Sequence, residues 1–395
     1  MNLNIMKNIF SLFILLLSGL SFGQVQNEYA SIDNQISKMP DNLSNSTKSI
    51  ASYINANFKT ENEKIRAIFY WTSSKISYDI NNMYAVNFNE TSEEKIKKTL
   101  ETKKGICINY AEIFNDIANK VGIKSIIIEG YTKQMNKVDY VPHAWCAAKI
   151  DNKWYVFDPT WGSGYVNKNK FVRKVNNYYY KTDPTKIISS HMPFDYMWQF
   201  LNYPVTNQEF YTGKTQVNKS KTYFDFATEI SNYEKLSEVD KLTTSVGRME
   251  KNGVKNAMIF DRVSGKKREI ENFKQNEVVA DFNNIVSIYN EGVNELNEFI
   301  NYRNKQFKPV VSDEEIKKMI ESPMNKLLNS QELINNLGQI DKNNKASVNS
   351  VRKSIAETLK QATEQEMFVM KYLSKSKIAR KSMFYKATWL GVPLN

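Results

Sequence analysis

The segment from Pro142 to Gly162 constrains the fold of this chain most, because it predicts two strands with a defined register. Apolar and aromatic residues lie on both sides of Asp151-Asn152, a dipeptide suited to the turn of a β-hairpin. If these two residues form the whole loop, Ile150 faces Lys153 and every pair further back along the hairpin follows from that one. A three-residue loop would move one strand to the opposite face.

This register places a histidine beside a carboxylate. Counting back from the turn puts Trp145 opposite Asp158, and His143 lies on the same face as Trp145. His143 and Asp158 are therefore predicted to be diagonal neighbours, within reach of a hydrogen bond. The β-rich run 123–129 should pair with the strand that carries His143, and residues 131–141 should form a polar connection.

A cysteine stands where a loop becomes a helix. Gly105 breaks the preceding pattern, and apolar residues then recur at helical spacing until Gly122, namely Ala111, Phe114, Ile117, Ala118 and Val121. Cys107 falls in the first turn, where unpaired backbone N–H groups and the helix dipole favour a thiolate. A cysteine nucleophile also needs a base and a residue that orients the base, and His143 and Asp158 are suited to those roles.

The motifs around these three residues resemble one protein family. Gly-Ile-Cys-x-x-Tyr-Ala surrounds Cys107, His-Ala-Trp begins at His143, and Phe-Asp-Pro-Thr-Trp-Gly-Ser-Gly contains Asp158. Together they resemble the transglutaminase-like superfamily, nearest its kyphoscoliosis-peptidase-like bacterial branch, over residues 45–210. The resemblance implies an α+β fold with a papain-like core, in which a helix carrying the cysteine packs on an antiparallel sheet. It also implies that Cys107 is the nucleophile, His143 the base and Asp158 the orienting residue.

Three tryptophans are candidates for the oxyanion hole or the cleft. Transglutaminases use an upstream tryptophan N–H in the oxyanion hole, and by that resemblance Trp71 is a candidate. The residues around Trp71 do not match the motif, however, and a core aromatic residue is the commoner explanation. Trp145 and Trp161, which lie close in sequence to His143 and Asp158, are the other two candidates.

Other interpretations of the site residues are weaker. His191 is the only other histidine, but it lacks strand alternation and an acid at hairpin spacing, so we favour His143 as the base. We expect His191 to pack or hydrogen-bond at the domain edge. A disulfide between Cys107 and Cys146 would consume the nucleophile, and Cys146 faces away from His143, which suggests a structural role. No metal site or cofactor is expected, because zinc spacings, an acidic calcium loop and nucleotide-binding motifs are missing from the sequence.

The charge of the chain bears on its partners. A net charge of +12 and a pI near 9.2 would suit an anionic partner such as a cell-envelope polymer. The basic residues are scattered, though, and no nucleic-acid-binding motif accompanies them, so no nucleic-acid partner is expected. The oligomeric state stays open.

The sequence divides into four predicted segments. Residues 1–23 have the basic, apolar and small-residue regions of a signal peptide, which predicts export to the periplasm or outside the cell and no transmembrane segment in the mature chain. Residues 24–211 should form the transglutaminase-like domain. Residues 212–276 should be a mixed linker with short strands, at 222–226 and 257–263. Three amphipathic patterns predict a helical bundle over 277–395, and Ser312-Asp313-Glu314-Glu315 should cap its second helix.

The predicted chemistry is acyl transfer on amide bonds of proteins or peptides through a thioester. Hydrolysis by water would make the protein a peptidase or amidase, which the resemblance and the missing calcium loop favour. Attack by a lysine amine would make it a crosslinking transglutaminase. A non-enzymatic envelope or binding protein on the same fold is the third alternative, and the intact triad argues against it.

Overall fold

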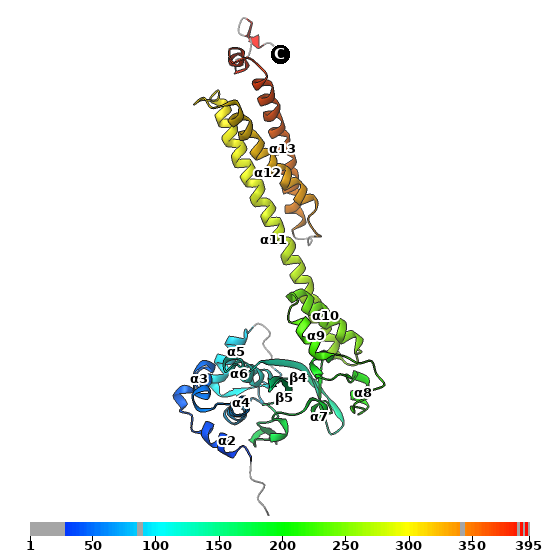
Figure 1. Ribbon diagram of the computed structural model, residues 1–395. Coiled ribbons are helices and arrows are strands. Elements are labelled where there is room, and N and C mark those ends of the chain that lie inside the picture. The colour runs from blue at the N-terminus through cyan, green and yellow to red at the C-terminus, as the bar shows by residue number, and fades with distance from the viewer. Residues whose placement is uncertain (1–27, 85–89, 340–343, 385–387, 390–391, 394–395) are drawn as a thin grey trace, which may run out of the picture. The chain divides into compact units, whose positions relative to one another are not determined.

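The computed structural model describes residues 28–84, 90–339, 344–384, 388–389 and 392–393, so the predicted signal peptide lies outside the described residues. The chain divides into two compact units between Lys266 and Lys267 (Figure 1). In the part of the chain that the structure describes, no helix combines the length and the apolar character needed to cross a bilayer.

A four-stranded antiparallel sheet lies at the centre of the first unit. Its order is β5-β4-β3-β8, with bounds Lys153–Phe157, Lys137–Ile150, Ser125–Gln134 and His191–Pro193. Ile150 pairs with Lys153, as the two-residue loop predicts. Asp151 and Asn152 both have positive φ, 49° and 64°, which is what a type I′ hairpin turn requires. The predicted register of this hairpin is confirmed.

The neighbouring hairpin is longer than expected. Strand β3 pairs with β4 from Ser125 to Gln134, as predicted for its first half. The prediction that residues 131–141 form a polar connection is wrong, because most of them extend the two strands. The reversal occurs at Met135 and Asn136, which both have positive φ (46° and 64°) without any glycine in the loop.

Helix α6 (Cys107–Lys120) covers one face of this sheet. On β4, Ala144, Cys146 and Ala148 belong to the same buried cluster as the α6 residues Ile113 and Phe114. Small side chains on the strand let the helix approach closely. Around α6 pack α3 (Thr47–Asn57), α4 (Glu61–Lys75) and α5 (Ser92–Thr102). This arrangement confirms the predicted α+β core.

Two short pairings and several short elements complete this core. β1 (Ser77–Tyr78) runs parallel to β2 (Lys104–Gly105), just before the cysteine helix. The others are α2 (Ala30–Ser37), η1 (Asp41–Leu43), β6 (Gly164–Asn167), β7 (Lys170–Arg173), η2 (Asn177–Tyr179), α7 (Pro184–Ile187), η3 (Tyr196–Gln199) and α8 (Asn207–Tyr211). Buried Arg66 of α4 holds α2 through two 2.7 Å hydrogen bonds to Asp33.

The opposite face of the sheet is covered by residues that follow it in sequence. Trp145 and Val156 pack there with Met197, Phe200 and Ile230, the last from α9 (Phe226–Tyr233). Arg248 of α10 (Glu238–Lys251) is nearly buried and makes two 2.8 Å hydrogen bonds to Asp195, which caps η3.

The prediction of strands at residues 222–226 and 257–263 is wrong. Asp225 accepts the N–H of Thr228 and starts α9. Asn256 accepts the N–H of Ile259 at the start of α11 (Ala257–Asn304). Ile259 and Val263 are both buried, four residues apart, which is helical rather than strand spacing. An Asx cap and this spacing outweigh the β-propensity of the apolar residues.

The second unit contains the rest of α11 with α12 (Asp313–Asn335) and α13 (Lys345–Leu373), followed by η4 (Ala379–Phe384), β9 (Thr388–Trp389) and β10 (Val392–Pro393). The three predicted apolar stripes meet in one buried cluster, which includes Ile285, Leu327 and Ile355. Ser312 and Glu315 form the predicted capping box of α12. The helical character predicted for this region is confirmed.

Candidate active site

Cys107 is the first residue of α6. The Asn109 side chain accepts the backbone N–H of Ile106 at 2.9 Å and so fixes the start of the helix. At Gly105 a Cβ would lie 2.5 Å from the Cβ of Asn109, so this junction requires glycine. Gly105 is also paired with Tyr78, which ties the loop before the cysteine to β1. The cysteine is therefore held in the first turn, as predicted.

His143 and Asp158 are brought together by the β4–β5 hairpin. The Nε2 of His143 lies 2.8 Å from the Oδ2 of Asp158. The Oδ1 of Asp158 accepts the backbone N–H groups of Thr160, at 2.8 Å, and Trp161, at 3.0 Å. The carboxylate side chain is completely buried. The predicted neighbours thus form a hydrogen-bonded pair that the following turn holds in place.

The charges of this pair are strongly coupled. Burial alone would lower the pKa of His143, but the charge of Asp158, the hydrogen bond to it and a hydrogen-bonding contact with Cys107 together raise it to about 10. Burial would raise the pKa of Asp158, yet the two histidines beside it hold that pKa well below its usual range. At neutral pH His143 is an imidazolium between a carboxylate and the Cys107 thiol.

A second histidine binds the same carboxylate. The Nε2 of His191 lies 3.0 Å from the Oδ2 of Asp158, and its Nδ1 lies 2.9 Å from the Oγ of Ser190. Both ring nitrogens of His191 are therefore occupied, which leaves neither to face Cys107. His191 packs and hydrogen-bonds, as expected, but it does so against Asp158 and not at the domain edge. The pairing of β8 with β3, Thr132 opposite His191, brings it to the centre of the site, and a three-residue strand leaves too short a pattern to reveal that pairing.

The three candidate tryptophans separate into two groups. The ring centres of Trp145 and Trp161 lie 5.9 Å and 5.6 Å from that of His143. Trp71 lies in the core, 1% exposed, with the Lys103 ammonium 5.5 Å from its ring. Its indole N–H has no hydrogen-bond partner among the described residues. No hydrogen bond or ring contact joins Trp71 to the triad within the described part of the chain.

Cys146 is chemically isolated from this cluster. It lies on the opposite face of β4, and its S–H donates to the carbonyl of Ala111 at 3.4 Å. Burial raises the pKa of this thiol well above its usual value. Both cysteines are free, so no disulfide competes for Cys107.

One group of potential metal ligands occurs among the described residues. His143, Asp158 and His191 each offer one ligand atom, and these atoms lie within 4.8 Å of one another. They are ligand types that zinc accepts, although the sequence spacing does not suggest a zinc site. The same atoms are already hydrogen-bonded to each other. An ion would displace the proton between His143 and Asp158, so we assign no metal to the cluster.

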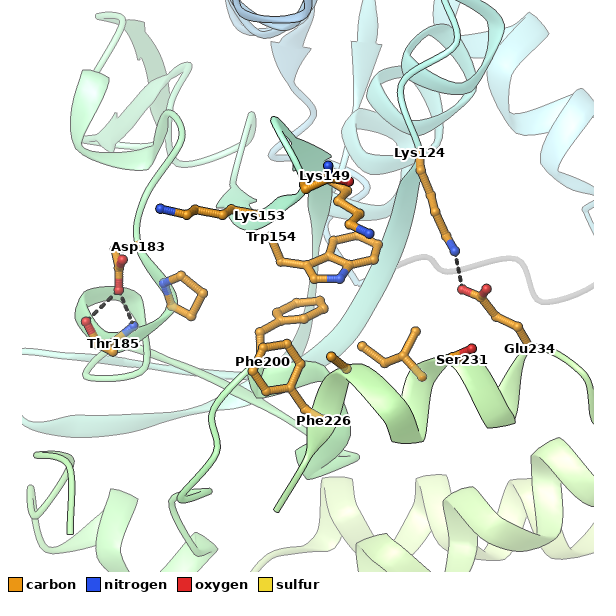
Figure 2. Close-up of a pocket in the computed structure, with 14 residues that line it drawn as sticks. Lys124, Lys149, Lys153, Trp154, Asp183, Thr185, Phe200, Phe226, Ser231 and Glu234 are labelled. Atoms are coloured by element: carbon orange, nitrogen blue, oxygen red, sulfur yellow. Dashed lines mark hydrogen bonds and ion pairs between the residues drawn. The ribbon is translucent and has the colours of Figure 1, made fainter. Parts of the chain in front are cut away.

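A separate cavity of about 490 Å³ lies on the first unit, and none of its lining residues belongs to the triad. Figure 2 shows Trp154 and Phe200 stacked within it, with ring centres 4.9 Å apart, and the Lys124–Glu234 ion pair at one side. This cavity is therefore not the candidate active site.

Known proteins resemble this chain over its first half. Residues 48–159 match the model of a family described as the transglutaminase-like superfamily. Kyphoscoliosis peptidase of Mus musculus is 30% identical over 176 residues, which cover 41% of this chain and 25% of that protein. The Homo sapiens protein of the same name is 32% identical over 162 residues, covering 38% and 24%. The chain thus spans about a quarter of the length of these curated relatives.

Among solved structures, a candidate cysteine protease from Cytophaga hutchinsonii is 21% identical, with a TM-score of 0.25, covering 30% of this chain and 37% of that chain. The segment matched by the family contains Cys107 at the start of α6, His143 on β4 and Asp158 directly after β5. The curated relatives carry the name of the branch that those motifs resemble. Residues 48–159 of this chain are a domain of the transglutaminase-like superfamily.

Proposed function

We propose that this protein is an exported cysteine-dependent acyl-transfer enzyme that acts on amide bonds of proteins or peptides, with Cys107, His143 and Asp158 as its catalytic residues. The observation that supports it most is the 2.8 Å His143–Asp158 hydrogen bond beside a cysteine at a helix start. An imidazolium with a pKa of about 10 stabilises a neighbouring thiolate and can later donate its proton. Export rests on the signal-peptide pattern of residues 1–23.

The proposed reaction begins with attack of the Cys107 thiolate on an amide carbonyl. The C–S bond forms, and the negative oxygen is held by the backbone N–H of Cys107 and a second donor. His143 then gives its proton to the amide nitrogen, the C–N bond breaks, and the amine leaves a thioester behind. Neutral His143 next takes a proton from water, whose oxygen attacks the thioester and releases a carboxylic acid and the thiolate. Asp158 keeps the imidazole oriented throughout.

Hydrolysis is favoured over crosslinking. The curated relatives are named peptidases, and the sequence has no acidic loop of the kind that binds calcium. If a lysine amine replaced water in the second step, the product would be an isopeptide crosslink. Both products arise from the same thioester, so one reaction mixture can separate them.

The test incubates the purified protein with dimethylated casein and a fluorescent primary amine. New N-termini measure hydrolysis, and protein-bound fluorescence measures amine incorporation. We expect hydrolysis in the wild type, none with Cys107→Ala, and nearly full activity with Cys146→Ala, because Cys146 is buried on the other face of β4. Predominant fluorescence would indicate a crosslinking enzyme. Equal activity of Cys107→Ala and the wild type would refute the triad.

A further inference from the structure

We propose that His191 is a positioning residue of the triad, which donates its Nε2–H to the Oδ2 of Asp158 and so fixes the carboxylate for His143. This role rests on the proposed acyl-transfer function. The sequence motifs alone assign His191 no role in the reaction.

The first argument is the occupancy of Asp158. Its Oδ1 accepts two backbone N–H groups, and its Oδ2 lies within 3.0 Å of both imidazole Nε2 atoms. A buried carboxylate in this geometry is satisfied by four donors and has no need of water. Without His191, one lone pair of Oδ2 would face apolar surroundings, and Oδ2 could move away from His143.

The second argument concerns the tautomer of His191. An ionised carboxylate only accepts, so the Nε2 of His191 must carry a proton. Its Nδ1 then accepts from Ser190, whose hydroxyl lies 2.9 Å away and has a more distant alternative acceptor, the carbonyl of Ile187 at 3.3 Å. Ser190 thus selects the tautomer that donates to Asp158.

The third argument is charge. Burial lowers the pKa of His191, although the hydrogen bond to Asp158 opposes this, so the ring is neutral where His143 is charged. The rings of Trp145 and Trp161 meet it edge-on, with centres 5.1 Å and 4.7 Å away. A neutral donor orients the carboxylate without competing with His143 for its negative charge.

The fourth argument is that His191 is anchored by a part of the sheet separate from the hairpin that holds His143 and Asp158. His191 lies on β8, whose partner is β3, whereas His143 and Asp158 belong to the β4–β5 hairpin. The backbone N–H of Lys133 donates to the carbonyl of Ser190 at 2.9 Å and anchors the strand just before His191. The Oδ2 atom of Asp158 is therefore held from β8, a strand that contains neither His143 nor Asp158.

The first test needs no substrate. The chain has two histidines, so nuclear magnetic resonance of protein labelled with ¹⁵N-histidine shows only two imidazoles. At pH 7.5 we expect one doubly protonated ring, His143, and one neutral ring protonated on Nε2, His191. His191→Phe leaves one ring and assigns the spectrum. A charged second ring, or one protonated on Nδ1, would overturn the proposal.

The second test separates positioning from packing. Phe fills the volume of the ring without a donor, whereas the amide nitrogen of Gln can take the place of Nε2. Loss of one hydrogen bond to a charged group predicts that His191→Phe lowers casein hydrolysis roughly 10- to 100-fold, and that His191→Gln stays within about 3-fold of the wild type. If His191 only packed, His191→Phe would be more active than His191→Gln, and that result would refute the positioning role.

Alkylation of Cys107 by iodoacetamide at pH 6 distinguishes failure of this role from failure of the enzyme function. Suppose that the wild type hydrolyses no casein, and that alkylation is slowed in His191→Phe but not in His191→Gln. The positioning role of His191 then stands and the proposed reaction fails. If hydrolysis depends on Cys107 while Phe and Gln variants react alike, the reaction stands and the role of His191 fails.

Discussion

Replacing Asp158 with Asn removes the charge of the orienting residue and leaves its shape. The amide has one acceptor and one donor atom. If its oxygen keeps the N–H groups of Thr160 and Trp161, at 2.8 Å and 3.0 Å, its nitrogen faces the Nε2 atoms of both histidines. His143 must then lose its Nε2 proton and keep the one on Nδ1, whereas His191 must move its proton from Nε2 to Nδ1. For His143 this places a proton toward Cys107, which is the wrong tautomer for a base.

The magnitude follows from the charges. Raising the pKa of His143 from 6.5 to about 10 corresponds to about 5 kcal/mol in favour of the imidazolium. Without Asp158, only the contact with Cys107 still opposes the effect of burial on the pKa of His143, so we expect a neutral His143 at pH 6. An ordinary thiol, with a pKa of about 8.5, is only about 0.3% ionised at that pH. The thiolate of a more acidic thiol is also less nucleophilic, which partly offsets the gain from ionisation. We therefore expect alkylation of Cys107 at pH 6 to slow by about 10- to 100-fold in Asp158→Asn.

The assay measures the rate of iodoacetamide alkylation of Cys107 from pH 5 to 9. Casein hydrolysis should fall about 10- to 1000-fold, less than the loss of about 10⁴ in a serine triad, because the helix start already favours the thiolate. Asp183→Asn is the matched control, since this exposed carboxylate only caps α7.

The folded state should survive the substitution. Both changes in protonation restore a donor for every acceptor, because the Ser190 hydroxyl can turn to the carbonyl of Ile187 when His191 carries its proton on Nδ1. We therefore expect the melting temperature to fall by only about 2–4 °C, or about 1 kcal/mol. A normal alkylation profile in folded Asp158→Asn would refute the coupling between Asp158 and Cys107.

Three further predictions follow from the same geometry. Native protein should be alkylated at Cys107 alone, whereas unfolded protein should also react at Cys146; mass spectrometry of the digested protein would reveal an error in either assignment. Because the folded pKa of His143 lies above its unfolded value, the stability it contributes is full below pH 6.5 and lost as pH rises toward about 10. Urea unfolding should show that decline in the wild type, and the same slope in Asp158→Asn would contradict it. In Gly130→Ala the new Cβ would meet the Met192 carbonyl at 2.2 Å and push β8 away from β3, so hydrolysis should fall at least about 10-fold. Gly247→Ala serves as the control, because this glycine is exposed within α10 and a Cβ there would meet nothing within 4 Å.

Local sequence was sufficient for the pair at the centre of the site. A two-residue turn at Asp151-Asn152 determines every later pairing of the β4–β5 hairpin, because side chains alternate strictly along a strand. The start of α6 was likewise readable, since a glycine followed by helical spacing marks a helix terminus within a few residues. His143, Asp158 and Cys107 could therefore be placed from interactions close in sequence.

Other elements depended on contacts that no local pattern records. Residues 131–141 resembled a polar loop, yet they pair as strands because β3 and β4 supply each other's hydrogen bonds. The apolar run at 257–263 resembled a strand, yet Asn256 caps it and its burial follows helical spacing.

His191 marks the boundary between what the sequence determines and what the tertiary structure decides. Composition showed that it was the only alternative base, but its neighbours in sequence place it in a three-residue strand with no readable register. Its position arises when β8 pairs with β3 across 59 residues, Thr132 opposite His191, and delivers the ring to Asp158. The short turn of one hairpin is enough to hold His143 near Asp158. His191, which hydrogen-bonds to the same carboxylate from a distant strand, reaches its position only when the whole sheet has formed.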